Sequence, residues 1–261
     1  MLPATVIALA ATLVAGAISA LGGPRVTALE WSAYDRWLRG REGAPSRPPL
    51  VVVVRDPASE ARFGRDGWDR ALLARVITNL ARAGAGVIGV DVGLATPGVG
   101  GRGGPAADAL LSEATAMAGN VVYPVPPAPP VPPLAQRARG GGHILTAPDA
   151  DGVVRKVPLF VSRDGAAVPA FGLALAAALR GTDADRPPVD GVGTREPGAA
   201  RSGPVQIPVD RHGPSLVGFS GSGFPRGTTV VPFSEVWTAI EERRLETLQR
   251  LVEDNLVLVA A

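Results

Sequence analysis

The chain has 261 residues, of which 46% are hydrophobic, so it is long enough to form a substantial core in one large α/β domain or two small ones. It contains no cysteine, which excludes a disulfide framework and a thiolate metal site. The net charge is only +2, and the basic residues, all arginine except Lys156, are spread along the chain. Since they form no cluster with interleaved aromatic residues, we expect no nucleic-acid partner.

The first predicted element is a membrane segment. Residues 4–22 carry no charge, and as a helix they would span roughly 28 Å, close to the ~30 Å hydrocarbon core of a bilayer. Residues 1–22 are therefore predicted to form an uncleaved transmembrane anchor, with a cleaved signal peptide as the alternative. The arginines that follow would by themselves keep the next segment in the cytoplasm, so charge alone leaves the orientation open.

A second helix is predicted over residues 28–39. Trp31, Tyr34 and Leu38 recur at spacings of three and four, which places them on one face. We expect this face to dock onto the domain core. An aromatic anchor at a membrane interface is the alternative.

A strand-helix-strand unit follows and indicates the fold class. Residues 50–54 and 86–90 are short, unbroken apolar runs, which is typical of parallel strands buried on both faces. Between them, leucine, valine and isoleucine recur every three or four residues, as in an amphipathic crossover helix, and Gly84 is placed to end it. The unit predicts an α/β fold with a parallel sheet.

Each of these two strands is followed by an aspartate, and the pair is the main candidate site. Asp56 and Asp91 are expected near the carboxyl ends of neighbouring strands, where open α/β sheets bind ligands. In one interpretation they line a pocket and bind a ligand, with Ser59, Trp68 and Arg155 as weaker candidates. In the other, Asp56 caps the turn DPAS and Asp91 accepts backbone hydrogen bonds.

The rest of the chain is expected to complete this sheet and to add an antiparallel part. A glycine-rich loop at 98–105, a helix at 106–118 and a strand at 120–125 give the order βαβαβ. The second half is predicted to contain, in chain order, a hairpin of 142–146 with 153–161 around the turn PDADG, a buried helix at 170–179, a strand pair of 205–209 with 215–219, a helix at 234–251 and a strand at 256–260.

The order of these segments resembles the CHASE2 sensor domain family. The most specific matching blocks are AGAGVIGVDV and GHILTAPDADGVVRKVPL, and the resemblance covers residues 28–261. It implies an extracytoplasmic input domain of a bacterial transmembrane receptor, with a helix before it and helices after it that lead to an adenylate or guanylate cyclase, a histidine kinase or a Ser/Thr kinase. Because those later helices are absent, residues 28–261 are expected to be a sensor domain truncated at its C-terminal end.

Catalytic and cofactor motifs are incomplete in this chain. The glycines of 98–103 do not lie in a strand-to-helix turn, which argues against a dinucleotide site, and GFSGS at 218–222 lacks the last glycine of a nucleophile elbow. His143 and His212 have no metal-binding partner at helical spacing, and PDADG lacks the further ligands of a calcium loop. We therefore expect no enzyme activity in this chain, no cofactor and no metal.

Together these patterns predict an α/β domain with a mostly parallel central sheet flanked by helices, an inserted antiparallel hairpin and an N-terminal transmembrane helix. The predicted function is that of a membrane-bound extracytoplasmic sensor that binds an unknown small-molecule or protein signal. One alternative is an anchored or secreted α/β hydrolase that uses Asp56 and Asp91 on a metal. Another is a domain that mediates homodimerisation between receptors.

Overall fold

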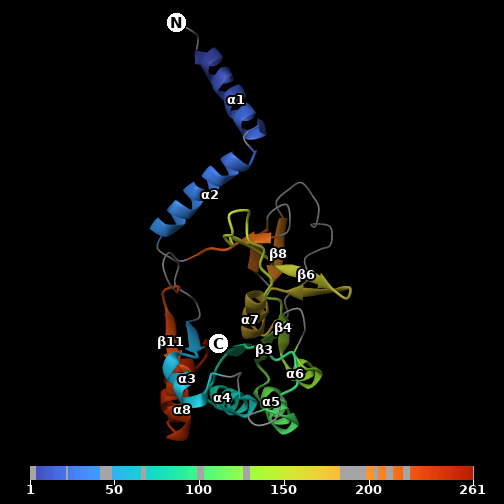
Figure 1. Ribbon diagram of the computed structural model, residues 1–261, viewed down its shortest axis with the longest axis vertical. Helices are drawn as coiled ribbons and strands as arrows, with labels where there is room; N and C mark the ends of the chain where they lie inside the picture. The colour runs from blue at the N-terminus through green and yellow to red at the C-terminus, as the bar shows by residue number, and fades with distance from the viewer. Residues whose placement is uncertain are drawn as a thin grey trace.

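A six-stranded parallel sheet forms the centre of the molecule (Figure 1). The computed structural model describes residues 4–21, 23–41, 49–65, 69–98, 103–125, 130–182, 198–202, 205–209, 214–219 and 224–260. The strands lie side by side, all parallel, in the order β11 (Thr228–Pro232), β1 (Leu50–Val54), β12 (Leu256–Ala260), β2 (Val87–Asp91), β3 (Val121–Pro124) and β4 (Gly140–Gly142). The predicted parallel sheet is confirmed, and β11 is an additional strand at its edge.

The predicted crossover unit is present, but its two strands are not neighbours. Helix α4 (Arg70–Arg82) connects β1 to β2, and it ends just before Gly84, which has a φ of 83°. Strand β12 pairs with β1 on one side and with β2 on the other. The expectation that Asp56 and Asp91 follow neighbouring strands is therefore wrong. An apolar strand gains most when it lies between two others, and in β12 the side chains of Val257 and Val259 are 0% exposed.

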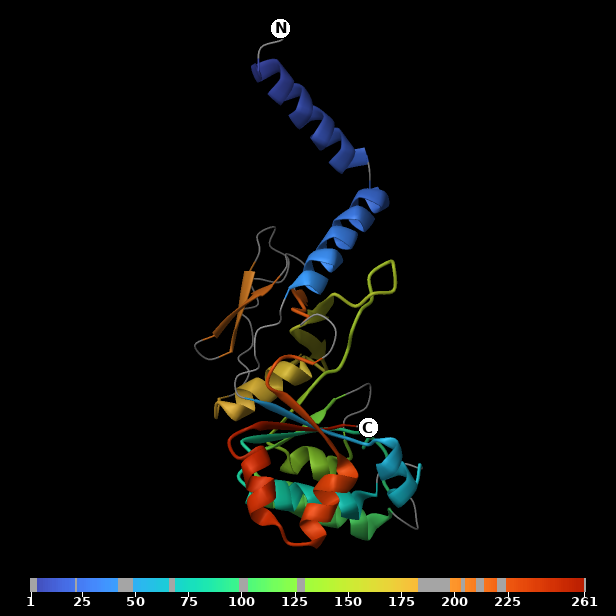
Figure 2. The same ribbon diagram turned by 90° about the vertical axis from the view of Figure 1, so that its left-hand side faces the viewer.

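Helices cover the two faces of the sheet unequally (Figure 2). Five helices pack on one face: α4, α5 (Pro105–Ala118), α6 (Pro132–Arg137), α8 (Phe233–Glu241) and α9 (Leu245–Val252). The other face receives α7 (Phe171–Leu179), whose Leu175 packs against Val87 and Val122. The helix predicted at 234–251 is in fact two helices, because the chain turns at Arg243, which has a φ of 56°.

The antiparallel part differs from the predicted hairpins. The segment after Gly142 does not pair with 153–161; instead β5 (Lys156–Pro158) pairs with β10 (Pro214–Leu216). The hairpin lies further on, where β6 (Phe160–Arg163) pairs with β7 (Ala166–Pro169). Its turn is Asp164-Gly165, and both residues have positive φ, 50° and 79°, as the favoured two-residue hairpin turn requires.

The strand pair predicted at 205–209 and 215–219 is also wrong. Strand β9 (Val205–Val209) pairs with β8 (Gly198–Ser202), where no strand was predicted. Strand β10 pairs with β5, where Ser215 lies opposite Val157 although the two residues are 58 positions apart in the sequence. Each strand therefore has a partner other than its expected one.

Helices α1 (Ala4–Leu21), α2 (Gly23–Gly40) and α3 (Pro57–Phe63) are also present among the described residues, and α3 follows β1. Helix α1 points away from the domain, and the side chains of residues 4–17 are exposed (Figures 1 and 2). Within the described residues, no helix meets the length and apolarity needed to cross a bilayer, so the structure does not support the predicted transmembrane helix.

Gly142 provides a test of how α7 is positioned on the sheet. A Cβ atom at this residue would lie 2.5 Å from Cα and 2.7 Å from the backbone nitrogen of Phe171, at the start of α7. Because backbone atoms cannot move aside cheaply, we expect Gly142→Ala to destabilise the fold by about 2 kcal/mol, measured by urea denaturation.

The control for this substitution lies on the same strand. A Cβ atom at Gly140 would meet nothing within 4 Å, so Gly140→Ala should leave the urea midpoint nearly unchanged. Equal midpoints for the two variants would show that α7 does not approach β4 as closely as the structure indicates.

Candidate functional site

The structure separates the two aspartates of the predicted pocket. Because β12 lies between β1 and β2, the ends of those two strands are about 10 Å apart, two inter-strand spacings. Asp91 is the last residue of β2 and is exposed. The structure therefore does not bring Asp56 and Asp91 together as a pair, and any ligand contact by either one stays a prediction.

Asp56 begins helix α3, as the capping interpretation predicted. Its Oδ1 accepts hydrogen bonds from the Ser59 backbone nitrogen at 2.9 Å and from the Ser59 hydroxyl at 2.5 Å. These bonds, above all the one from the hydroxyl, lower the pKa of the Asp56 carboxyl from its usual value. The completely buried Ser59 also accepts a bond from the Ser234 nitrogen at 2.9 Å. Asp56 and Ser59 thus fix α3 to the start of α8.

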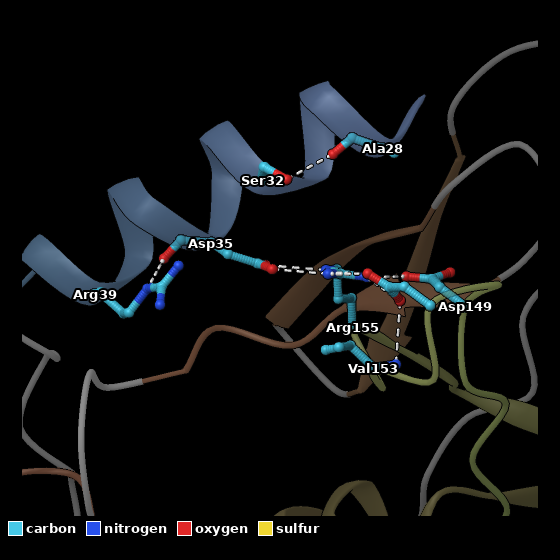
Figure 3. Close-up of polar contacts among 8 residues, drawn as sticks. Ala28, Ser32, Asp35, Arg39, Asp149, Val153 and Arg155 are labelled. Carbon is cyan, nitrogen blue, oxygen red and sulfur yellow. Dashed lines mark hydrogen bonds and ion pairs between the residues drawn. The ribbon is translucent and has the colours of Figure 1, made fainter. Parts of the chain in front are cut away.

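Arg155 lies apart from those residues, at the centre of an ionic cluster (Figure 3). Its side chain is 2% exposed, and three carboxylates surround it. The Asp35 carboxylate of α2 accepts from Nε at 2.9 Å and from Nη2 at 2.7 Å. Asp151 accepts from Nη1 at 2.9 Å and Nη2 at 2.7 Å, and Asp149 accepts from Nη1 at 3.0 Å. We call these four residues the Arg155 cluster.

A tight turn positions the carboxylates of Asp149 and Asp151, which lie on the core side of the cluster. In PDADG, the Gly152 nitrogen donates to the Asp149 carbonyl at 2.9 Å, and the Asp149 nitrogen donates to the Val153 carbonyl at 2.9 Å. Gly152 has a φ of 81°, which suits glycine at this position. The predicted turn is therefore confirmed, although the strands that were expected to flank it do not pair.

The side of α2 that faces the core carries an aromatic ring as well as Asp35. The Trp31 ring lies 5.1 Å from the Arg155 guanidinium carbon and 5.4 Å from the Lys156 ammonium nitrogen. Asp35 is four residues further along the helix and so on the same face. The expected docking of this helix is confirmed, but the contacts of Trp31 and Asp35 are cationic and ionic rather than an apolar stripe.

The charges of the Arg155 cluster stabilise one another. Hydrogen bonds from Arg155 lower the pKa of Asp35, and they lower the pKa of Asp151 to about 2. The same contacts, led by that of Asp35, raise the pKa of Arg155. Since three carboxylates converge on one cation, loss of Arg155 would leave like charges facing one another across the joint between α2 and the core.

The remaining sequence candidates are placed as follows. Trp68, His212 and Ser220 lie outside the described residues, as do residues 99–102 of the glycine-rich loop. His143 is buried, and its Nδ1 accepts a bond from the Leu145 nitrogen at 3.2 Å. Burial lowers the pKa of His143. In the part of the chain that the structure describes, no three His, Asp or Glu residues are grouped so that they could hold a metal ion.

Sequence reasoning named Arg155 but missed its partners. Asp35 and Arg155 are separated by 120 residues, and no local pattern relates them. Two local signals were available. The turn residues Asp149 and Asp151 lie six and four positions before Arg155, and Trp31 lies one helical turn before Asp35.

The pKa values of the cluster give a test by pH titration. A carboxyl whose pKa is lowered on folding adds stability above its unfolded pKa near 3.8, and that contribution is lost as the pH falls through the folded value. We expect the Asp151 carboxyl to titrate at about 2 in carbon-detected NMR, and the Asp35 carboxyl below 3.8. In Arg155→Gln both should move upward. Titration near 3.8 in both proteins would contradict the described contacts.

The comparisons with known proteins agree with the sequence resemblance. No curated protein and no solved structure matches the chain. The family described as the CHASE2 domain matches residues 6–261, essentially the whole chain. CHASE2 domains are known as extracytoplasmic sensors rather than catalytic domains. On this match, the chain belongs to the CHASE2 domain family.

Proposed function

We propose that this chain is the extracytoplasmic input domain of a membrane receptor and that α2 carries its signal. Membership of the CHASE2 family supports the sensory role. The observation that carries the rest is the Arg155 cluster, because its bonds to Asp35 are the ionic link between α2 and the core. In this proposal a cyclase or a kinase, encoded outside the sequence given, reads the signal.

The position of α1 supports an anchoring role for it. Residues 4–21 have no charged side chain, and those of residues 4–17 are exposed and do not pack on the domain. An uncharged helix with no intramolecular partner is suited to lipid. Helix α2 follows directly, so a shift of the core that moves Asp35 would move the end of α1 as well.

A signal could work through the Arg155 cluster only if it bound two states of the domain with different affinity. One state has Asp35 bonded to Arg155, as described here. In the other, Asp35 is released to water, and Arg155 keeps its bonds to Asp149 and Asp151. The Asp35 side chain is 30% exposed whereas that of Arg155 is 2% exposed, so Asp35 already contacts water, and its release leaves Arg155 bonded to the two carboxylates of the turn.

A metal-dependent hydrolase that uses Asp56 and Asp91 is the less well supported of the two candidate functions. Asp56 already uses Oδ1 to cap α3, and β12 separates its strand from that of Asp91. The geometry thus supports the sensor over a shared metal site at these carboxylates.

Reporter fusions test the location that we propose. Alkaline phosphatase is active only outside the cytoplasm, whereas green fluorescent protein exported in the same way does not fluoresce. With either reporter joined after Ala261, we expect phosphatase activity in the membrane fraction and no fluorescence. Strong fluorescence with inactive phosphatase would overturn the extracytoplasmic location.

A charge in α1 tests the anchor separately. Leu13 lies near the middle of α1 and is 66% exposed, so an arginine there would not disturb protein packing but would cost about 3 kcal/mol in a bilayer centre. We expect Leu13→Arg to shift the chain from the membrane to the soluble fraction. Leu29→Arg, at a 71% exposed position on α2, is the control and should stay in the membrane. Equal partitioning of both variants would argue against the anchor.

A further inference from the structure

A groove on the helical face of the domain gathers three arginines. It has a volume of about 470 Å³ and lies between α4, α8 and α9, at the end of the molecule opposite α1 (Figures 1 and 2). Arg75, Asn79 and Arg82 line it from α4, and Arg243 lines it from the turn between α8 and α9. This is within the size range of small-molecule sites.

The charge of this groove has no acidic counterpart in its described lining. Among the residues that the structure describes, no acidic side chain lines it. The acidic residues nearest to Arg243 in the sequence form ion pairs with other arginines. Glu241 pairs with Arg62, and Glu242 pairs with Arg244 at 2.7 Å. The three arginines are exposed, so water screens part of their mutual repulsion, and an anion between them would lower it further.

Two of the arginines are held in place. The guanidinium carbon of Arg75 lies 4.9 Å from the centre of the buried Trp237 ring, which restricts where its donors can point. Arg243 occupies a left-handed conformation with a φ of 56°, which is unusual for a residue with a side chain. The turn fixes it, because the Arg243 nitrogen donates to Ile240 at 3.2 Å and the Arg244 nitrogen donates to Ala239 at 2.8 Å.

The rest of the lining is apolar. Ile240, Leu245 and Leu248 form this wall, and Ile240 and Leu248 belong to the buried core. A ligand that contacted both the arginines and the apolar wall would carry an oxyanion, which accepts hydrogen bonds from the guanidinium groups. It would also carry a short aliphatic segment, which packs against the wall.

We propose that this groove binds a small organic oxyanion, a carboxylate or a phosphate ester with a short aliphatic part. The role of that anion as the signal rests on the proposed function, whereas its binding does not. Arginine suits planar, two-point recognition of either oxyanion, so both chemistries are included.

NMR titration of the purified chain tests this proposal with glutarate and inorganic phosphate as probes. We expect saturable shifts of backbone amides in α4 and in residues 239–248, absent when sodium chloride is added to the same ionic strength. Arg82→Gln and Arg243→Gln should each weaken binding about tenfold, since each removes a charged donor. Tighter binding of glutarate than of phosphate would identify the contribution of the apolar wall.

Arg250→Gln is the matched control, because Arg250 is an exposed arginine of α9 that does not line the groove. It should bind as the unaltered chain does. The proposal is overturned if neither probe gives saturable shifts, or if all three variants keep the original affinity. Since anion binding is measured on the purified chain and location is measured with reporter fusions in cells, either result leaves the location test unaffected.

Discussion

The structure depends on one buried arginine for the position of its N-terminal helices. The guanidinium of Arg155 is shared between Asp35 on one side and Asp149 and Asp151 on the other, and the Trp31 ring closes over it. The N–H groups of this buried guanidinium all donate to carboxylates, which holds those carboxylates in one arrangement. Moving one of them away leaves a charge without a partner in the protein. A joint of this kind gives α2 defined positions relative to the core rather than a continuous range of them.

The sheet beneath that joint is stiff for a different reason. Strand β12 enters between β1 and β2, so the last part of the described chain closes the central layer. Five helices cover one face, and α7 packs on the other, toward the antiparallel strands and α2 (Figure 2). The arginine-lined groove and the Arg155 cluster therefore lie on opposite sides of one sheet. If the anion is the signal, its effect must pass through packed side chains of that sheet.

The sequence predicted the parts of the fold that local patterns determine. The runs 50–54 and 256–260 are apolar throughout, and both form strands inside the parallel sheet as expected. The middle three residues of β1 are buried, whereas β12 alternates between buried and partly buried residues. The crossover helix followed from its leucine and isoleucine spacing, and its end from Gly84. Strand order could not be predicted in this way, because nothing in β12 itself says which two strands it will separate. The usual adjacency of consecutive strands failed at this point.

The same limit explains the errors in the antiparallel part and in the site. The Asp164-Gly165 dipeptide is a strong hairpin signal that was overlooked, whereas the pairing of β5 with β10 depends on distant residues. The cap formed by Asp56 and Ser59 is local, and the capping interpretation of DPAS anticipated it. The Arg155 cluster joins residues 120 positions apart, so only its turn could be anticipated.

The central claim is that Asp35 holds α2 to the core through Arg155, and a double-mutant cycle read by amide hydrogen exchange tests it most directly. The cycle uses Asp35→Asn, Arg155→Gln and the double variant, with amides of α4 reporting on the core and Glu30→Gln as an exposed carboxylate control on α2. We predict faster exchange in α2 for each single variant, unchanged exchange in α4 for Asp35→Asn, and a double variant no faster than Arg155→Gln alone. Additive effects of the two substitutions, or α2 exchange in Asp35→Asn equal to that in Glu30→Gln, would contradict the account.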